Sequence, residues 1–266
     1  MKKLSATSIA KSLAALAVVT CANASFAAST WTFNGCSTAT ASLAVCSGTG
    51  GAGSVSVTAF GVDNSSAGAQ YASASIGYNG TSGLGVFSGT ESGSPEHAVD
   101  NNTRTDALLL NFGTQLVDLD AVKIGWNNGG GYDSDISLFR YTGAGAPALV
   151  GKTITGLTGL AAVGWTLVGN YADLAENVNK TVNTNNTASS WWLVSAYNSN
   201  FGTTTSDGGA VTGGGSIGMG SIDYFKFLSV TGEVRTSKVP EPGSLALLGL
   251  GLVGLVASRR RKQASV

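Results

Sequence analysis

The apolar residues between positions 48 and 230 come in short runs, and this pattern restricts the fold more than any other feature of the sequence. The runs are separated by Gly, Asn, Ser and Asp, the residues that favour turns. Short runs bounded by turn residues are typical of β-strands, and no strong helical period accompanies them. We therefore expect an all-β domain, built as a β-sandwich or a jelly roll.

Nine segments carry this strand pattern. They are Ser54–Phe60, Gln70–Tyr78, Leu84–Phe87, Ala107–Phe112, Ala121–Trp126, Ile136–Tyr141, Gly164–Val168, Trp191–Ala196 and Tyr224–Val230. Val122, Ile124 and Trp126 alternate with Lys123 and Gly125, as expected of a sheet with one solvated face. The run Trp191–Val194 does not alternate, which predicts a strand covered on both faces. Only Ala172–Val178 shows a helical pattern, and it is short.

The first 27 residues have the features of a secretory signal peptide. Three lysines within the first eleven positions precede an apolar stretch, Leu13–Val19, and small residues allow cleavage after Ala27 or, alternatively, after Ala24. Cys21 lacks the small preceding residue that a lipoprotein signal requires. We therefore expect the Sec-type export machinery to carry residues 28–238 across the inner membrane as a β-rich exported domain.

Two cysteines remain after the predicted signal, Cys36 and Cys46. An even number of cysteines in an exported chain predicts a disulfide, because the compartment outside the cytoplasm is oxidising. A pair of reduced thiols is the alternative. A zinc site is poorly supported, since the chain has no CxxC pattern and His97 is its only histidine.

The C-terminal tail has three parts in a fixed order. A rigid strip comes first, then the apolar run Leu245–Ala257, and then a basic stop. The strip is Val239, Pro240, Glu241 and Pro242, and the stop is Arg259, Arg260, Arg261 and Lys262. As a helix the apolar run would cover about 20 Å, less than the roughly 30 Å of a bilayer core. The prolines should keep the strip non-helical and accessible, and the basic residues should stay cytoplasmic.

This tail resembles the sorting signal of PEP-CTERM proteins, which occur in Gram-negative bacteria that make exopolysaccharide. The resemblance covers residues 239–263 and implies that a membrane-bound exosortase recognises Pro240, Glu241 and Pro242. It also implies that the chain is held only transiently at the inner membrane and is then delivered to the cell surface or extracellular matrix. A permanent single-span anchor and a buried helix of a soluble domain are the alternatives.

The body is similar, more loosely, to a subgroup of exosortase-dependent surface proteins. The stretches that carry this similarity are His97–Asn101, Asp106–Phe112, Val122–Trp126, Ser134–Leu138, Trp191–Asn198 and Asp223–Phe227. The subgroup is defined largely by its sorting signal. The similarity therefore implies a location and no activity.

Charge is segregated along the chain, although the formal net charge is zero. Seven of the 15 basic residues lie in the two terminal segments, which leaves eight in residues 28–238 against fourteen acids. Nucleic-acid binding needs clustered Lys and Arg that neutralise phosphates. The acidic body therefore argues against a nucleic-acid partner.

Two catalytic patterns occur formally and are readily explained by the abundance of Gly and Ser. The segment 214–218 fits GxSxG, but a nucleophile elbow needs a histidine later in the chain, and His97 comes earlier. The segment 48–53 fits GxGxxG, but no apolar strand precedes it and no helix follows. We interpret both, with the Gly-rich stretch 127–131, as loops. We expect no catalytic residue and no cofactor.

Acidic and amide residues gather in two places, at Asp100-Asn101-Asn102 with Asp106 and at Asp133 with Asp135. Calcium binds oxygen ligands of this kind in loops. The alternative is turn chemistry, in which Asp and Asn bond to their own backbone. We predict no metal site, with calcium kept as the open alternative.

Four tryptophans are candidates for stacking on sugar rings: Trp126, Trp165, Trp191 and Trp192. A tryptophan in a strand more often belongs to the core. The resemblance of the tail implies a surface or matrix protein that is processed by an exosortase and associated with exopolysaccharide or biofilm, and we expect it to be non-enzymatic. A carbohydrate-binding module is the alternative, and a secreted hydrolase that uses a carboxylate pair is a third hypothesis.

Overall fold

The computed structural model describes residues 28–64, 68–91, 95, 97–153, 156–207, 209 and 222–235. These residues form an all-β fold in which every strand pair is antiparallel, as the short apolar runs predict. The signal peptide and the sorting signal, including Val239 to Pro242 and Arg259 to Lys262, lie outside the described residues. Among those residues, no helix is long and apolar enough to span a bilayer.

The strands are β1 (Ser29–Thr32), β2 (Ser37–Thr40), β3 (Leu43–Ser47), β4 (Ser54–Asp63), β5 (Ala72–Tyr78), β6 (Leu84–Phe87), β7 (Val99–Asp100), β8 (Arg104–Asn111), β9 (Leu116–Trp126), β10 (Ile136–Tyr141), β11 (Trp165–Tyr171), β12 (Lys180–Thr181), β13 (Ala188–Ser189), β14 (Trp191–Ala196) and β15 (Tyr224–Arg235). The helical elements are the short α1 (Gly156–Ala161) and the 3-10 turns η2 (Phe33–Gly35), η3 (Gly80–Ser82) and η4 (Ser199–Phe201).

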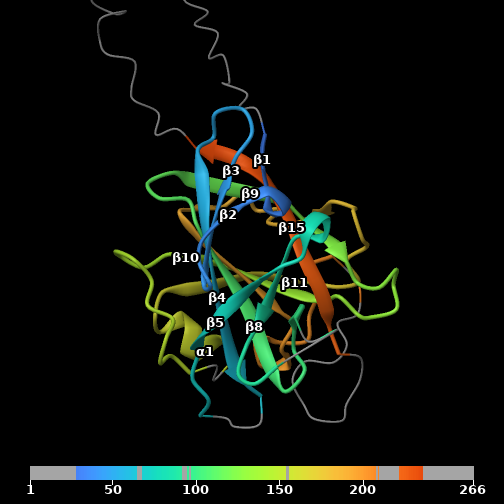
Figure 1. The fold of residues 1–266 in the computed structure, drawn as a ribbon. Helices are drawn as coiled ribbons and strands as arrows, with labels where there is room; N and C mark the ends of the chain where they lie inside the picture. Colours follow the sequence, from blue (N-terminus) through green and yellow to red (C-terminus); the bar gives the residue numbers. More distant parts are fainter. Residues whose placement is uncertain are drawn as a thin grey trace, which may run out of the picture.

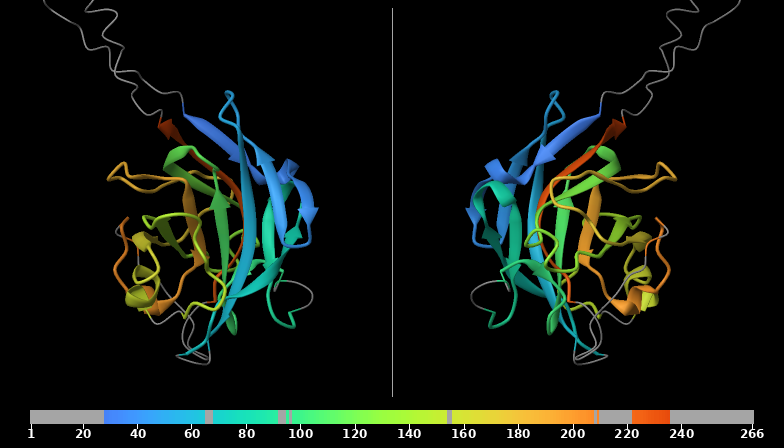
Figure 2. Two further views of the ribbon diagram at one scale, coloured as in Figure 1. Left: turned by 90° about the vertical axis from the view of Figure 1, so that its left-hand side faces the viewer. Right: turned by 90° about the vertical axis from the view of Figure 1, so that its right-hand side faces the viewer.

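The strands form one continuous sheet that curls until its two halves face each other (Figures 1 and 2). The first half has the order β11-β10-β14-β8-β4, and the second has β6-β15-β9-β12. Strand β5 joins the halves, because it pairs with β4 on one side and with β6 on the other. The two halves act as the layers of a sandwich, and their facing sides enclose the core.

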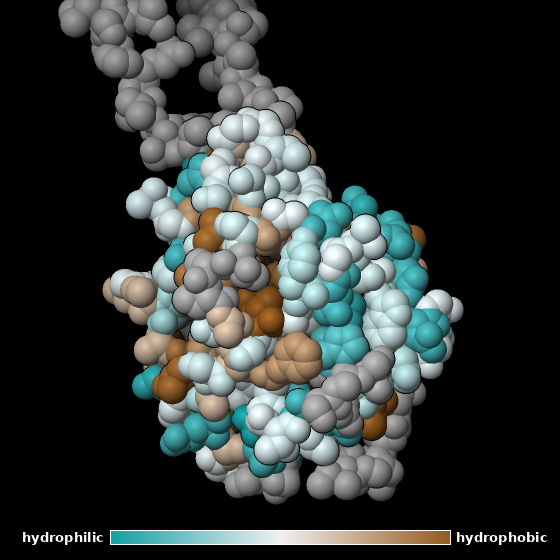
Figure 3. All heavy atoms as spheres, viewed as in Figure 1, coloured by the Kyte–Doolittle hydropathy of each residue, from teal (hydrophilic) through white to brown (hydrophobic). Residues whose placement is uncertain are grey.

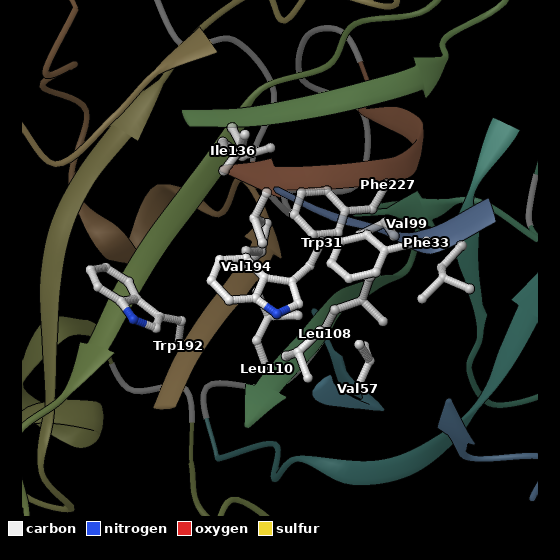
Figure 4. Packing of buried hydrophobic residues seen from close by; sticks show 14 of the residues in the cluster. Trp31, Phe33, Val57, Val99, Leu108, Leu110, Ile136, Trp192, Val194 and Phe227 are labelled. Atoms are coloured by element: carbon white, nitrogen blue, oxygen red, sulfur yellow. The ribbon is translucent and has the colours of Figure 1, made fainter. Parts of the chain in front are cut away.

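The main core lies between these halves and draws side chains from both (Figure 4). Trp31 of β1 and Phe33 of η2 are 0% exposed and pack among Leu108 of β8 and Phe227 of β15. Phe33 stacks on Phe227 with ring centroids 5.1 Å apart. The first residues after the predicted signal therefore help to close the sandwich.

A second core covers the outer face of the first half. Leu193 of β14 and Phe139 of β10 lie there under Leu160 of α1 and Phe201 of η4. Trp192 and Val194 point the other way, into the main core. This explains why Trp191–Val194 does not alternate: the strand is buried on both faces, as predicted.

All nine predicted strands are present, with ends that differ by a few residues. The alternation in β9 is confirmed for Val122 and Ile124, which are buried on either side of the half-buried Lys123, but not for Trp126, which is half-buried like Gly125. The additional strands β1 to β3 are rich in Ser, Thr and Ala, and β7, β12 and β13 have two residues each. Segments this short carry no readable period.

The predicted helix at Ala172–Val178 is wrong. Asp173 and Asn177 adopt left-handed φ angles of 51° and 60°, which interrupt a helix. The segment instead runs along the sheet, where Glu176 forms an isolated bridge with Ile124. The helix that does form, α1, contains two glycines and six residues and is stabilised by packing of Leu160 into the second core.

The two ends of the described chain lie together at one pole (Figures 1 and 2). Strand β1 pairs with the end of β15, so that Ser29 is opposite Gly232. The segment that leads to the sorting signal thus leaves the domain next to its first strand. The helix α1 lies away from this pole.

Candidate functional site

The predicted disulfide between Cys36 and Cys46 is confirmed. It fastens the start of β2 to β3, and Cys46 is buried in the main core. A loop of this length contributes about 2 to 3 kcal/mol in the chain-entropy estimate. The bond therefore strengthens a hairpin that has few large apolar side chains of its own.

The four tryptophans proposed for sugar stacking divide into two pairs. Trp165 is 1% exposed and Trp192 is 0% exposed, so both belong to the core and neither can reach a ligand. The Trp192 indole N–H donates to the carbonyls of Val117 and Ser189, each at 3.1 Å. Trp126 and Trp191 are half-buried and line hollows on the surface.

Trp191 lines an open groove of about 460 Å³ where β10, β13 and β14 meet. Tyr141 and Arg140 from the end of β10 face the same space, together with Ser190. Among the described residues, the Arg140 guanidinium forms no ion pair with a carboxylate. Leu116, which is 49% exposed, borders the groove and pairs with Arg235, so the groove lies at the pole where the described chain ends.

Hydrophobic side chains on the face shown in Figure 3 occur in small groups separated by polar surface. Among the residues that the structure describes, the large hydrophobic ones with substantial exposure are Tyr78, Phe87, Leu116, Val150, Val178 and Ile222. Only Leu116 among them borders the groove. The groove is therefore defined by its aromatic and basic side chains rather than by a broad apolar patch.

Trp126 lines a smaller hollow of about 220 Å³ with His97 and Lys226. Lys226 is 2% exposed, its ammonium donates to the His97 carbonyl, and Nζ lies 5.5 Å from the centre of the Trp126 ring. Burial lowers the pKa of Lys226 to about 7, and the negative charges of Asp100 and Asp106 offset this only in part. A lysine that is buried in this way destabilises the fold when it is charged.

This arrangement predicts a pH-dependent stability that Lys226→Met removes. The unfolded lysine has a pKa of about 10.4, whereas the folded one titrates near 7, so the unfolded chain binds more protons between these values. The free energy of unfolding of the wild type, relative to the variant, should therefore rise from pH 7 to pH 10 by up to about 1.4 kcal/mol per unit. Urea unfolding at four pH values measures this. If the difference in free energy of unfolding between the wild type and Lys226→Met stays constant from pH 7 to pH 10, the prediction is wrong.

The predicted acidic group at Asp100 and Asp106 is brought together with a third member, Glu91. Asn101, which is adjacent in sequence, does not join it. Because successive residues in an extended segment point to opposite sides, the Asn101 side chain reaches Asp223 instead, at 2.5 Å. The Asn102 backbone N–H donates to Asp100 Oδ1 at 2.9 Å. The sequence grouping of Asp100, Asn101, Asn102 and Asp106 was therefore only partly correct.

Asp133 and Asp135 lie together as predicted, and Asp223, the residue just before β15, lies beside them. Asp223 Oδ1 accepts a hydrogen bond of 2.6 Å from the Asp135 backbone N–H. Burial, followed by the charge of Asp135, raises the pKa of Asp223 well above its usual range. Sequence reasoning missed Asp223 because 88 positions separate it from Asp135 and no local pattern joins them.

The two formal catalytic patterns give no site in the described residues. The segment 48–53 is a turn between β3 and β4, in which Gly50, Gly51 and Gly53 adopt positive φ angles. The GxSxG segment lies outside the described residues. The Gly-rich stretch 127–131 is a turn, as predicted.

A disulfide is typical of exported proteins as a class, because the compartments outside the cytoplasm are oxidising. The tail gives the more particular assignment: the family model described as the PEP-CTERM protein-sorting motif matches residues 238–262. The chain carries this motif at its C-terminus and is an exosortase-targeted, exported protein directed to the cell surface. No curated protein and no solved structure matched the chain.

Proposed function

We propose that this chain is a non-enzymatic protein of the cell surface or extracellular matrix of a Gram-negative bacterium, associated with exopolysaccharide. The observation that carries the proposal is the sorting motif at residues 238–262, joined to a stably packed β-domain. The Sec-type machinery exports the chain, the tail holds it transiently at the inner membrane, and the exosortase then processes it. The domain is the part that remains at the surface.

The chemistry of the described residues supports a non-enzymatic role. Cys36 and Cys46 are joined in a disulfide, and His97 stacks on Phe87 with ring centroids 5.9 Å apart. The carboxylates of Asp106 and Asp223 are 0% exposed, and a polysaccharide cannot contact them. A glycosidase needs two carboxyl groups that flank the scissile bond.

A carbohydrate-binding module is the second candidate, and the groove beside Trp191 favours it. An indole face next to Tyr141 offers apolar surface for the C–H face of a sugar ring, while Ser190 and the groove's other polar groups can bind hydroxyls. Arg140, which has no carboxylate partner among the described residues, would bind an acidic sugar in a charge-assisted pair. The favoured ligand is therefore a uronic-acid-containing polysaccharide.

One experiment tests both candidates with the purified protein and acidic exopolysaccharide. We expect no new reducing ends after prolonged incubation, and their appearance would overturn the non-enzymatic proposal. For the binding candidate, Trp191→Ala should weaken retention on immobilised polysaccharide about tenfold, which corresponds to the loss of about 1.4 kcal/mol.

The matched control is Trp126→Ala, which removes a half-buried tryptophan outside the groove. It should leave retention unchanged. Equal retention by Trp191→Ala and the wild type, with both proteins folded by circular dichroism, would rule out the groove as the binding site.

A further inference from the structure

Three carboxylates that the proposed function does not use gather where three segments meet. Asp100 ends β7, Asp106 lies in β8, and Glu91 lies in the turn after β6. One carboxylate oxygen of each lies within 4.8 Å of the other two. Asp100 and Asp106 are both 0% exposed. Like charges this close and this deeply buried are strongly unfavourable unless a proton or a cation neutralises them, and burial with the charge of Glu91 raises the pKa of Asp106 well above its usual range.

Asp106 has a carboxylate oxygen that no described residue satisfies. Its Oδ1 atom is buried and has no hydrogen-bond partner there, whereas Oδ2 accepts from the Asp100 backbone N–H at 3.4 Å. The neighbouring Ser88 hydroxyl donates its single proton to Glu91 Oε1 at 3.1 Å and accepts from Arg104 Nε at 3.2 Å. A fully buried carboxylate oxygen without a donor points to a cation as its partner.

The two basic side chains nearest to this cluster do not donate to Asp106. Arg104 donates to Ser88 Oγ and to the Gly61 carbonyl, and Lys226 donates to the His97 carbonyl. Even with both side chains counted as charged, the carboxylates outnumber the cations three to two. Counted over Arg104 and Lys226, the charges leave the cluster negative.

We propose that Glu91, Asp100 and Asp106 bind a calcium ion, with Asp106 Oδ1 as its most deeply buried ligand. The ligands are all carboxylate oxygens, which suit a hard cation, and calcium accepts irregular oxygen sites completed by carbonyls and water. The strand β4 closes one side of the site, because a Cβ at Gly61 would lie 3.1 Å from Asp106 Oδ1 and 2.4 Å from Ser88 Cβ. One oxygen of each carboxylate lies within 4.8 Å of the other two, a spacing that two Ca–O bonds of about 2.3 to 2.6 Å can span.

The bound ion would fasten the turn after β6 to β7 and β8. These elements come from both halves of the sheet, since β8 belongs to the first half and β6 to the second. Calcium is abundant outside cells, where extracellular modules bind it with Kd values of about 0.1 to 1 mM. The site would thus be filled only after export.

The second acidic cluster, formed by Asp133, Asp135 and Asp223, serves as a control. Both oxygens of Asp223 accept hydrogen bonds, Oδ1 from the Asp135 backbone and Oδ2 from the Asn101 amide. Asp133 Oδ1 accepts from the Ser134 backbone N–H at 2.9 Å. These carboxylates are stabilised by donors of the protein itself, and no ion is needed to satisfy Asp223.

Calcium titration of the purified full-length protein tests the proposal. Addition of 10 mM CaCl2 to protein treated with EDTA should raise the melting temperature by about 3 to 10 °C, and calorimetry should give a Kd below about 1 mM. Asp106→Asn should reduce the shift to less than about 1 °C. Its melting temperature in EDTA should equal or exceed that of the wild type, because the variant removes a buried negative charge without a donor.

The matched control Asp133→Asn should keep the full calcium shift. Glu91→Gln provides a second ligand variant at a half-buried position and should lose the shift even if Asp106→Asn fails to fold. The proposal is overturned if the wild type shows neither a heat of binding nor a thermal shift, if Asp106→Asn retains the shift, or if Asp133→Asn loses it.

Discussion

Replacement of Trp192 by alanine is expected to lower the free energy of unfolding by about 3 to 5 kcal/mol. The indole is 0% exposed in the main core. Its N–H donates to Val117 of β9 and to Ser189 of β13, so this side chain of the first half bonds to a strand of the second half. Alanine would leave a cavity and remove the donor from both buried carbonyls.

Equilibrium unfolding in urea measures this effect, and the neighbouring residue provides the control. Trp191→Ala removes the same side chain at a half-buried position and should cost no more than about half as much. Trp192→Phe keeps much of the volume but loses the two hydrogen bonds, and we expect an intermediate cost of roughly 2 kcal/mol. Equal destabilisation by Trp191→Ala and Trp192→Ala would show that Trp192 is not the anchor between the halves.

The fold class and the long strands could be predicted because the order of apolar and polar residues along each strand follows the burial of their side chains. Val122 and Ile124 of β9 alternate with less buried residues, and the run at Trp191–Val194 reports a strand between two cores. Turn residues divide these strands clearly. The disulfide was predictable for another reason. Cys36 and Cys46 are close in sequence, and an exported chain folds where disulfides can form.

The arrangement of distant residues was not predictable. Nothing near Asp223 indicates that it meets Asp135, and nothing near Glu91 indicates that it meets Asp106. These contacts depend on how the sheet curls, which is decided by side chains throughout the core. The groove beside Trp191 is a similar case, because its lining comes from four separate strands or loops.

A large change in the location of the protein is expected when the sorting motif is replaced. Replacement of Pro240, Glu241 and Pro242 by alanine removes the two fixed φ angles and the acid, and so removes the features that should keep this strip non-helical. The exosortase should then no longer recognise the tail, and the chain should accumulate unprocessed at the inner membrane. We expect the surface form to fall at least about tenfold, which corresponds to roughly 1.4 kcal/mol or more in recognition.

Fractionation of cells into inner membrane, outer envelope and extracellular matrix, followed by immunoblotting, measures this redistribution. The control is a double variant, Thr203→Ala with Thr204→Ala, which changes two exposed residues of the domain. It should be delivered like the wild type. Delivery of the motif variant in the same form and amount as the wild type would contradict recognition through Pro240, Glu241 and Pro242.

The most direct measurement is the mass of the protein extracted from the cell surface. We expect a chain that begins near residue 28, retains the domain through Arg235, and has lost the apolar run Leu245–Ala257 with the basic residues after it. The triple-alanine variant from the membrane fraction should retain them. A wild-type surface protein whose C-terminus is intact to Val266 would contradict exosortase processing.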